Sequence, residues 1–269
     1  MTSFATSRSS PPILEVIVSR LDTQPTPAAA TGLVCERMSA RYGSLTVCNG
    51  ISFSIAPGEL LALIGPNGAG KTSLVGALNG TVNGSGEVTL DGRRIDALPS
   101  WRRVGIGLTT VPDGRGLFPS LTVSDNLRLG ALLTEKSRRD EALTGALDLF
   151  PFLKARWGDA AGALSGGQQQ MLAIAKCLAS SPRVLMLDEP TQGLAPIIVD
   201  ELAEVLRTLC KRGLPILLVE QNHHLVETVA DRFIVLVGGK VVLEGGQADL
   251  ADRDRIANLY LQRSAAAIH

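Results

Sequence analysis

The sequence predicts an α/β fold built around a doubly wound, mainly parallel sheet. Three short runs, Leu60–Ile64, Val184–Leu187 and Ile216–Val219, are apolar throughout and do not alternate with polar residues. Such continuous runs are typical of parallel strands that helices cover on both faces. The first run passes through a glycine-rich turn into a helix-length segment, Lys71–Asn79, as expected for a fold in which strands and helices alternate.

Turn residues divide the rest of the chain into further elements. Apolar runs bounded by Gly, Pro or Asn predict more strands, at Gly50–Ile55, Gly86–Leu90, Phe233–Val237 and Lys240–Leu243. Segments of helical length that end before Gly, Ser or Pro predict more helices, at Ser137–Leu149, Gly166–Ala179 and Val199–Arg212. The stretch Thr122–Leu164 has a helical composition and no strand pattern, so we expect a helical insertion beside the sheet.

Residues 1–32 are rich in Pro, Ser, Thr and Ala, which predicts a flexible extension. The Ser and Arg residues there also fit a transit peptide, but the prolines favour the extension. Lys and Arg together number 26, and Asp and Glu together also number 26, so the formal net charge is zero. A basic surface for nucleic acid is therefore not expected. No run reaches the roughly 18 apolar residues needed to span a bilayer. The cysteines lack metal-binding spacing and predict free thiols in a reducing compartment.

The turn after Leu60–Ile64 has the composition of a phosphate-binding loop. Residues 65–72 read GPNGAGKT, which matches the pattern G-x-x-x-x-G-K-[ST] between a strand and a helix. Its glycines let backbone N–H groups converge on phosphate oxygens at the helix N-terminus. We expect Lys71 to bridge the β- and γ-phosphates and the Thr72 hydroxyl to bind Mg²⁺.

Two carboxylates follow the strand Val184–Leu187. Asp188 and Glu189 lie at the carboxyl end of a buried strand, where open α/β sheets bind their ligands. Successive strand residues point to opposite sides, so the two side chains should have different roles. Asp188 suits the Mg²⁺ site, and Glu189 suits a general base that polarises the attacking water.

A third motif, Leu164-Ser165-Gly166-Gly167-Gln168, begins an amphipathic helix. Ser165 and Gln168 fit a capping box, so a capped helix alone is one interpretation. Between a phosphate loop and a Val184–Glu189 strand, however, the motif resembles the signature of ATP-binding-cassette (ABC) ATPases. That resemblance implies a P-loop core with a mainly parallel sheet, an N-terminal antiparallel β subdomain and a helical subdomain at about 122–180. It also implies an ATPase domain over 33–246 and a C-terminal helical tail over 247–269.

The same resemblance implies a site for MgATP. Its ATP-binding residues are Tyr42, which resembles the adenine-stacking aromatic, and the loop residues Gly65, Pro66, Asn67, Gly68, Ala69, Gly70, Lys71, Thr72 and Ser73. In this family the signature of one subunit closes over ATP held by a second, so a dimer of identical or paralogous ATPases is expected.

Further motifs resemble one branch of the family. Val111–Arg115, Gly193–Pro196 and Val219–Asn222 are similar to the shorter of the two ATPases in branched-chain amino acid uptake systems. This implies two permease subunits, an extracytoplasmic solute-binding protein and a cytoplasmic location on the inner face of the cell membrane. Urea and amide uptake systems have similar ATPases, so these substrates stay open.

Two positions depart from the wider family. Asp113 stands where a glutamine usually contacts Mg²⁺ or water; it is a candidate metal ligand that Arg115 can balance, or simply part of a Pro-Asp-Gly turn. Gln221 replaces a switch histidine and cannot transfer a proton, which leaves Glu189 as the base. We expect His223 and His224 to lie on a surface helix. Two other hypotheses remain, a soluble cassette acting on DNA or ribosomes and a regulatory module without turnover.

Overall fold

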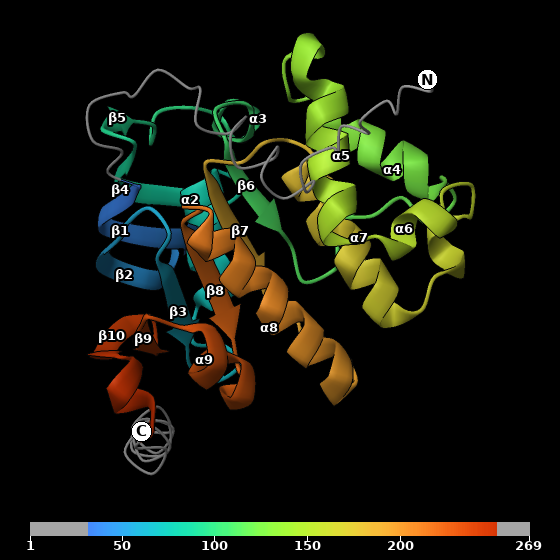
Figure 1. Cartoon of the computed structure of the whole chain (residues 1–269). Helices are drawn as coiled ribbons and strands as arrows, with labels where there is room; N and C mark the ends of the chain where they lie inside the picture. The colour runs from blue at the N-terminus through green and yellow to red at the C-terminus, as the bar shows by residue number, and fades with distance from the viewer. Residues whose placement is uncertain (1–31, 252–269) are drawn as a thin grey trace, which may run out of the picture.

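The computed structural model describes residues 32–251. The predicted extension therefore lies outside the described residues except for its last residue, and so does the predicted tail beyond residue 251. The chain forms two sheets and a group of helices beside them (Figure 1). Within residues 32–251, no helix is both long and apolar enough to cross a membrane.

The larger sheet has the strand order β10-β9-β3-β8-β7-β6. Its strands are β3 (Leu60–Ile64), β6 (Leu108–Val111), β7 (Val184–Asp188), β8 (Ile216–Glu220), β9 (Arg232–Val237) and β10 (Lys240–Gly246). All neighbouring pairs are parallel except β9 with β10. The sheet has two buried faces, since Leu60, Ala62 and Ile64 join one apolar core while Leu61 and Leu63 join the other. The predicted mainly parallel, two-faced sheet is confirmed.

The smaller sheet is antiparallel and has the order β2-β1-β4-β5. It consists of β1 (Leu33–Tyr42), β2 (Leu45–Ile55), β4 (Asn83–Leu90) and β5 (Arg93–Arg94). Its strands pack on α2 (Lys71–Asn79), so the helix that follows the phosphate loop lies between the two sheets. The antiparallel N-terminal sheet expected from the family resemblance is confirmed.

The other helices are α3 (Ser100–Gly105), α4 (Val123–Ala131), α5 (Arg139–Leu149), α6 (Phe152–Ala155), α7 (Gly166–Leu178), α8 (Pro196–Lys211) and α9 (His223–Val229). Three of them, α5, α7 and α8, correspond to predicted helices, whereas α3 was not predicted. Short 3₁₀ turns lie at Lys136–Arg138, Ala161–Ala163 and Gln247–Ala251. Helices α4 to α7 form a separate group beside the sheet (Figure 1). This group contains the expected helical insertion, in which one isolated bridge joins Thr122 to Ala160.

Register aligns the carboxyl ends of the central strands. Ile64 of β3 lies opposite Glu220 of β8, and Asp188 of β7 lies opposite Val219. The residues that follow these strands therefore emerge at one edge of the sheet, which is where open parallel sheets bind ligands.

Candidate active site

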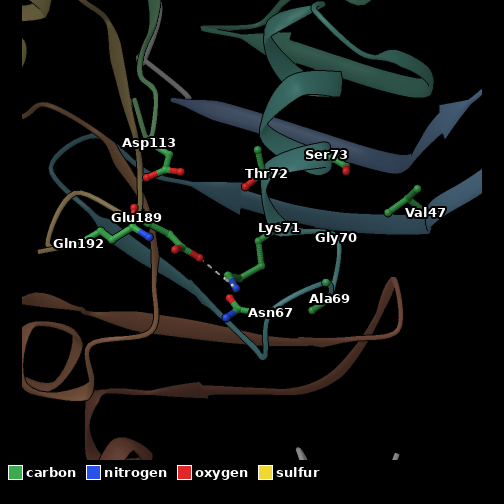
Figure 2. Close-up of a pocket in the computed structure, with 11 residues that line it drawn as sticks. Val47, Asn67, Ala69, Gly70, Lys71, Thr72, Ser73, Asp113, Glu189 and Gln192 are labelled. Atoms are coloured by element: carbon green, nitrogen blue, oxygen red, sulfur yellow. Dashed lines mark ion pairs between the residues drawn. The ribbon is translucent and has the colours of Figure 1, made fainter. Parts of the chain in front are cut away.

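A polar cavity of about 360 Å³ lies at this edge. It is lined by Val47, Asn67, Gly68, Ala69, Gly70, Lys71, Thr72, Ser73, Asp113, Glu189 and Gln192. Figure 2 shows Asp113 and Glu189 facing Lys71 and Thr72 across it. Most of the predicted phosphate-loop residues thus line one cavity together with two of the predicted carboxylates.

Position 70 of the phosphate loop requires glycine, because a side chain there would clash with a neighbouring residue. Gly70 is the N-cap of α2 with φ of 101°, and a Cβ there would lie 2.6 Å from the Cys48 sulfur atom. No side chain caps the helix, so its first N–H groups stay available to an anion.

Lys71 is 4% exposed and holds the loop closed upon itself. Its Nζ donates to the carbonyl oxygens of Gly65, at 2.8 Å, and Pro66, at 3.2 Å. The same Nζ lies 3.4 Å from Glu189 Oε1, an ion pair drawn in Figure 2. A buried cation therefore stands at the base of the cavity, with a carboxylate opposite.

Asp188 and Thr72 form the second polar pair of the site. The Thr72 hydroxyl donates to Asp188 Oδ1 at 3.3 Å. Burial raises the pKa of Asp188 to about 6, against the opposing effect of the Thr72 hydrogen bond, and the nearby carboxylates of Glu189 and Asp113 raise it further. A nearby cation would offset these unfavourable interactions of the charged form.

Glu189 differs from Asp188 in geometry as well as partners, because it follows the end of β7 and is not itself part of the strand. Its backbone φ is 49°, a left-handed conformation that is uncommon for a residue with a side chain. Its Oε1 accepts a hydrogen bond from Gln221 Nε2 at 2.6 Å, and the same Nε2 donates to Asn67 Oδ1 at 2.6 Å. Gln221 thus bridges the phosphate loop and Glu189.

Tyr42 lies at the rim of the site. Its side chain is 52% exposed, and Ser73 Oγ donates to its hydroxyl at 3.5 Å. Val47 and Gln192 line the cavity although the sequence offered no motif for either. Their positions, one on β2 and one after Glu189, become evident only once the sheets are assembled.

The five signature residues, Leu164 to Gln168, do not line this cavity. Ser165 accepts from the Gln168 backbone N–H, while the Gln168 side chain accepts from the Ser165 N–H, so the predicted capping box is confirmed. Ser165 and Gly166 are exposed at the start of α7. The motif is therefore accessible to another molecule.

Arg115, the residue expected to balance the charge of Asp113, donates a hydrogen bond from its guanidinium to Gln169 Oε1 at 2.6 Å. No ion pair between Arg115 and Asp113 is found within residues 32–251. Arg115 has a backbone φ of 62°, in the left-handed region, and lies in the turn after β6. By contrast, His223 and His224 begin α9 as predicted, and His224 contacts Asp200 on the exposed surface.

Comparison with known proteins identifies the kind of site. A family model described as ABC transporter matches residues 48–192. The chain is 38% identical to the high-affinity branched-chain amino acid transport ATP-binding protein BraG of Pseudomonas aeruginosa, over 84% of this chain and 97% of that protein. It is 32% identical to the lipopolysaccharide export system ATP-binding protein LptB of Acidithiobacillus ferridurans, over 85% of this chain and 96% of that protein.

The fold is also found among solved structures. The structure of cbiO1 from Clostridium perfringens, part of the ABC transporter complex cbiONQ, superimposes with a TM-score of 0.73. It is 28% identical in sequence, and the match covers 89% of this chain and 99% of that one.

Proposed function

Since this chain belongs to the ABC transporter family of ATP-binding proteins and is an ATPase, we propose that it energises the import of branched-chain amino acids. The observation that carries this proposal is the near full-length similarity to BraG, together with the Val111–Arg115 and Val219–Asn222 motifs. LptB, an export protein by its name, is less similar over the same part of the chain.

We assign the reaction to the residues that line the cavity. The phosphate loop from Gly65 to Ser73 binds the ATP phosphates through its backbone and Lys71, and Tyr42 contacts the base at the rim. Glu189 is the general base that takes a proton from the attacking water. Gln221, which donates to Glu189 at 2.6 Å, orients that carboxylate and transfers no proton.

Thr72, Asp188 and Asp113 fit a Mg²⁺ ion. A hydroxyl and two carboxylates provide the hard oxygen ligands that Mg²⁺ prefers, and ATP phosphates and water complete such sites. Burial raises the pKa of Asp188 to about 6 although the Lys71 cation lies nearby and lowers it, so a further cation at this carboxylate would favour its charged form. When bound, the ion supplies positive charge that stabilises the phosphate oxygens.

The signature Leu164–Gln168 serves a second subunit in this proposal. Its exposed N-terminal residues do not line the cavity of their own chain, so in this proposal they bind the ATP held by a partner ATPase, identical or paralogous. Closure of that dimer acts on two permease subunits, which an extracytoplasmic solute-binding protein supplies. The ATPase then lies on the cytoplasmic face of the membrane.

Two alternatives differ in substrate or direction. The motif resemblance also fits urea or amide uptake, which uses the same ATPase chemistry, and the similarity to LptB supports export. A regulatory module would bind ATP without hydrolysing it, so an ATPase assay separates it from the proposed transport ATPase. A soluble cassette for DNA or ribosomes is not favoured, because the chain has zero net charge.

The test is uptake by cells that lack this chain. Radiolabelled leucine uptake should fall in the deletion strain and return with the wild-type chain but not with Glu189→Gln. If the deletion strain takes up leucine normally but loses urea or amide uptake, the substrate is urea or an amide. A defect in neither, with altered envelope composition, would support export.

A further inference from the structure

Glu220 is a buried carboxylate next to the site that neither the phosphate loop nor the metal site uses. It is the last residue of β8 and 2% exposed. Within residues 32–251, no Lys, Arg or His forms an ion pair with it. A buried acid without a cation is costly unless hydrogen bonds satisfy both oxygens.

Both oxygens are fully satisfied. Oε1 accepts from the Thr191 backbone N–H at 2.9 Å and from the Thr191 hydroxyl at 2.6 Å. Oε2 accepts from the backbone N–H groups of Gln221, at 2.8 Å, and Asn222, at 2.9 Å. Only a carboxylate can accept at every one of these positions, because a glutamine amide would turn an NH₂ group toward one of the donor pairs.

The two loops that Glu220 joins carry Glu189 and Gln221. Thr191 lies two residues after Glu189, whose φ of 49° is a strained, left-handed conformation for a residue with a side chain. Gln221 reaches back to Glu189 through its 2.6 Å hydrogen bond. Glu220, Thr191, Glu189 and Gln221 therefore form a closed ring of covalent and hydrogen-bonded connections.

We propose that Glu220 is a positioning residue, which fixes the loop after β7 against the loop after β8 so that Glu189 and Gln221 meet. The inference rests on the proposed role of Glu189 as general base. Glu220 does not touch the cavity, so it acts on hydrolysis through the placement of Glu189 and leaves the phosphate loop intact.

The experiment compares Glu220→Gln with wild type, in the full-length protein, by ATP hydrolysis, ATP binding and ATP-dependent dimerisation. We expect kcat to fall by about 10-fold or more, since displacement of a catalytic group by about 1 Å can cost that much or more. The Kd for ATP should stay within about 3-fold of wild type, and ATP should still produce the dimer. Glu204→Gln, on the exposed face of α8, is the matched control and should behave as wild type.

Thr191→Val provides a second test if Glu220→Gln does not fold. It removes the hydroxyl donor but keeps the Thr191 N–H, and it should lower kcat by a smaller factor at unchanged ATP affinity. If both variants fold, their effects on kcat should be less than additive in the double variant, because the two substitutions break the same contact.

Each contrary result has a distinct meaning. The positioning role requires that Glu189→Gln is inactive. Given that, a wild-type kcat in a folded Glu220→Gln protein would overturn the role. If Glu220→Gln does not fold, a wild-type kcat in Thr191→Val would overturn it. Equal losses of ATP affinity, kcat and melting temperature would overturn it in favour of a general structural role. Wild-type hydrolysis by Glu189→Gln would instead overturn the proposed base.

Discussion

The Nζ atom of Lys71 lies 3.4 Å from Oε1 of Glu189, so the cation of the phosphate loop pairs with the carboxylate that follows β7. Lys71 is buried and Glu189 is 20% exposed, which keeps the pair only partly screened by solvent. An ATP phosphate that enters the cavity brings competing negative charge. We expect this phosphate to compete with Glu189 for Lys71 and to leave the Glu189 carboxylate free for its proposed role as general base.

Lys71→Ala should abolish ATP binding. The substitution removes the buried cation that faces the phosphates and the two hydrogen bonds that close the loop. Calorimetric titration with MgATP should show no measurable binding, while Lys211→Ala on the exposed end of α8 binds as wild type. An affinity for the Lys71 variant within about 3-fold of wild type would contradict the assigned role.

Asp188→Asn should stabilise the protein in the absence of nucleotide and metal. The folded-state pKa of about 6 lies above the value of about 3.9 in an unfolded chain, so the charged Asp188 destabilises the fold increasingly as pH rises from about 4 through 6. At pH 7.5 we expect the variant to melt roughly 5 °C higher than wild type.

The size of this difference should depend on pH. At pH 4.5 most wild-type molecules already carry a neutral Asp188, so the gap in melting temperature should shrink. A gap that stays constant between pH 4.5 and 7.5, measured by calorimetry, would show that the raised pKa does not control stability.

Asp113→Asn should raise the Mg²⁺ concentration needed for half-maximal hydrolysis several-fold. Asp113 lines the cavity and its charge acts on Asp188, so the substitution removes one of the anions that attract the ion. The measurement is ATPase rate against Mg²⁺ at saturating ATP. Asp140→Asn, exposed in the first turn of α5, is the control. An unchanged Mg²⁺ requirement would support the alternative that Asp113 only forms a turn.

His224→Ala should keep wild-type turnover, whereas Gln221→Ala should lower kcat by about 10-fold. His224 is exposed and contacts Asp200, while Gln221 donates to both Glu189 and Asn67. Loss of the Glu189 contact leaves the base less well placed. Steady-state hydrolysis separates the two outcomes, and a severe loss in His224→Ala would identify that histidine as the missing switch residue.

Strong local patterns allowed much of the fold to be predicted. The bounds of β3 and α2 match the expected Leu60–Ile64 and Lys71–Asn79, because an unbroken apolar run and a closing glycine are local signals. Strand β1, Leu33–Tyr42, was not predicted, since register shifts interrupt its alternation between Cys35 and Met38 and again beyond Met38. Strand β6 was not predicted, because two threonines in its four residues interrupt the apolar run that would indicate a buried strand.

In the candidate site, too, the residues that belong to local motifs were predicted, whereas contacts between distant segments were not. Lys71, Thr72, Asp188 and Glu189 were singled out because motifs fix residue type and spacing along the chain. The Arg115 to Gln169 hydrogen bond and the Glu220 to Thr191 contact join residues far apart in sequence. Their partners depend on how loops from different strands are packed, which spacing alone does not encode.

The most direct test of Glu189 as the general base is ATP hydrolysis by Glu189→Gln at saturating MgATP. The amide cannot take a proton from water, so we expect a loss of at least about 100-fold in kcat with ATP still bound and the dimer retained. Hydrolysis at the wild-type rate by the Glu189→Gln protein would contradict the claim that Glu189 is the base.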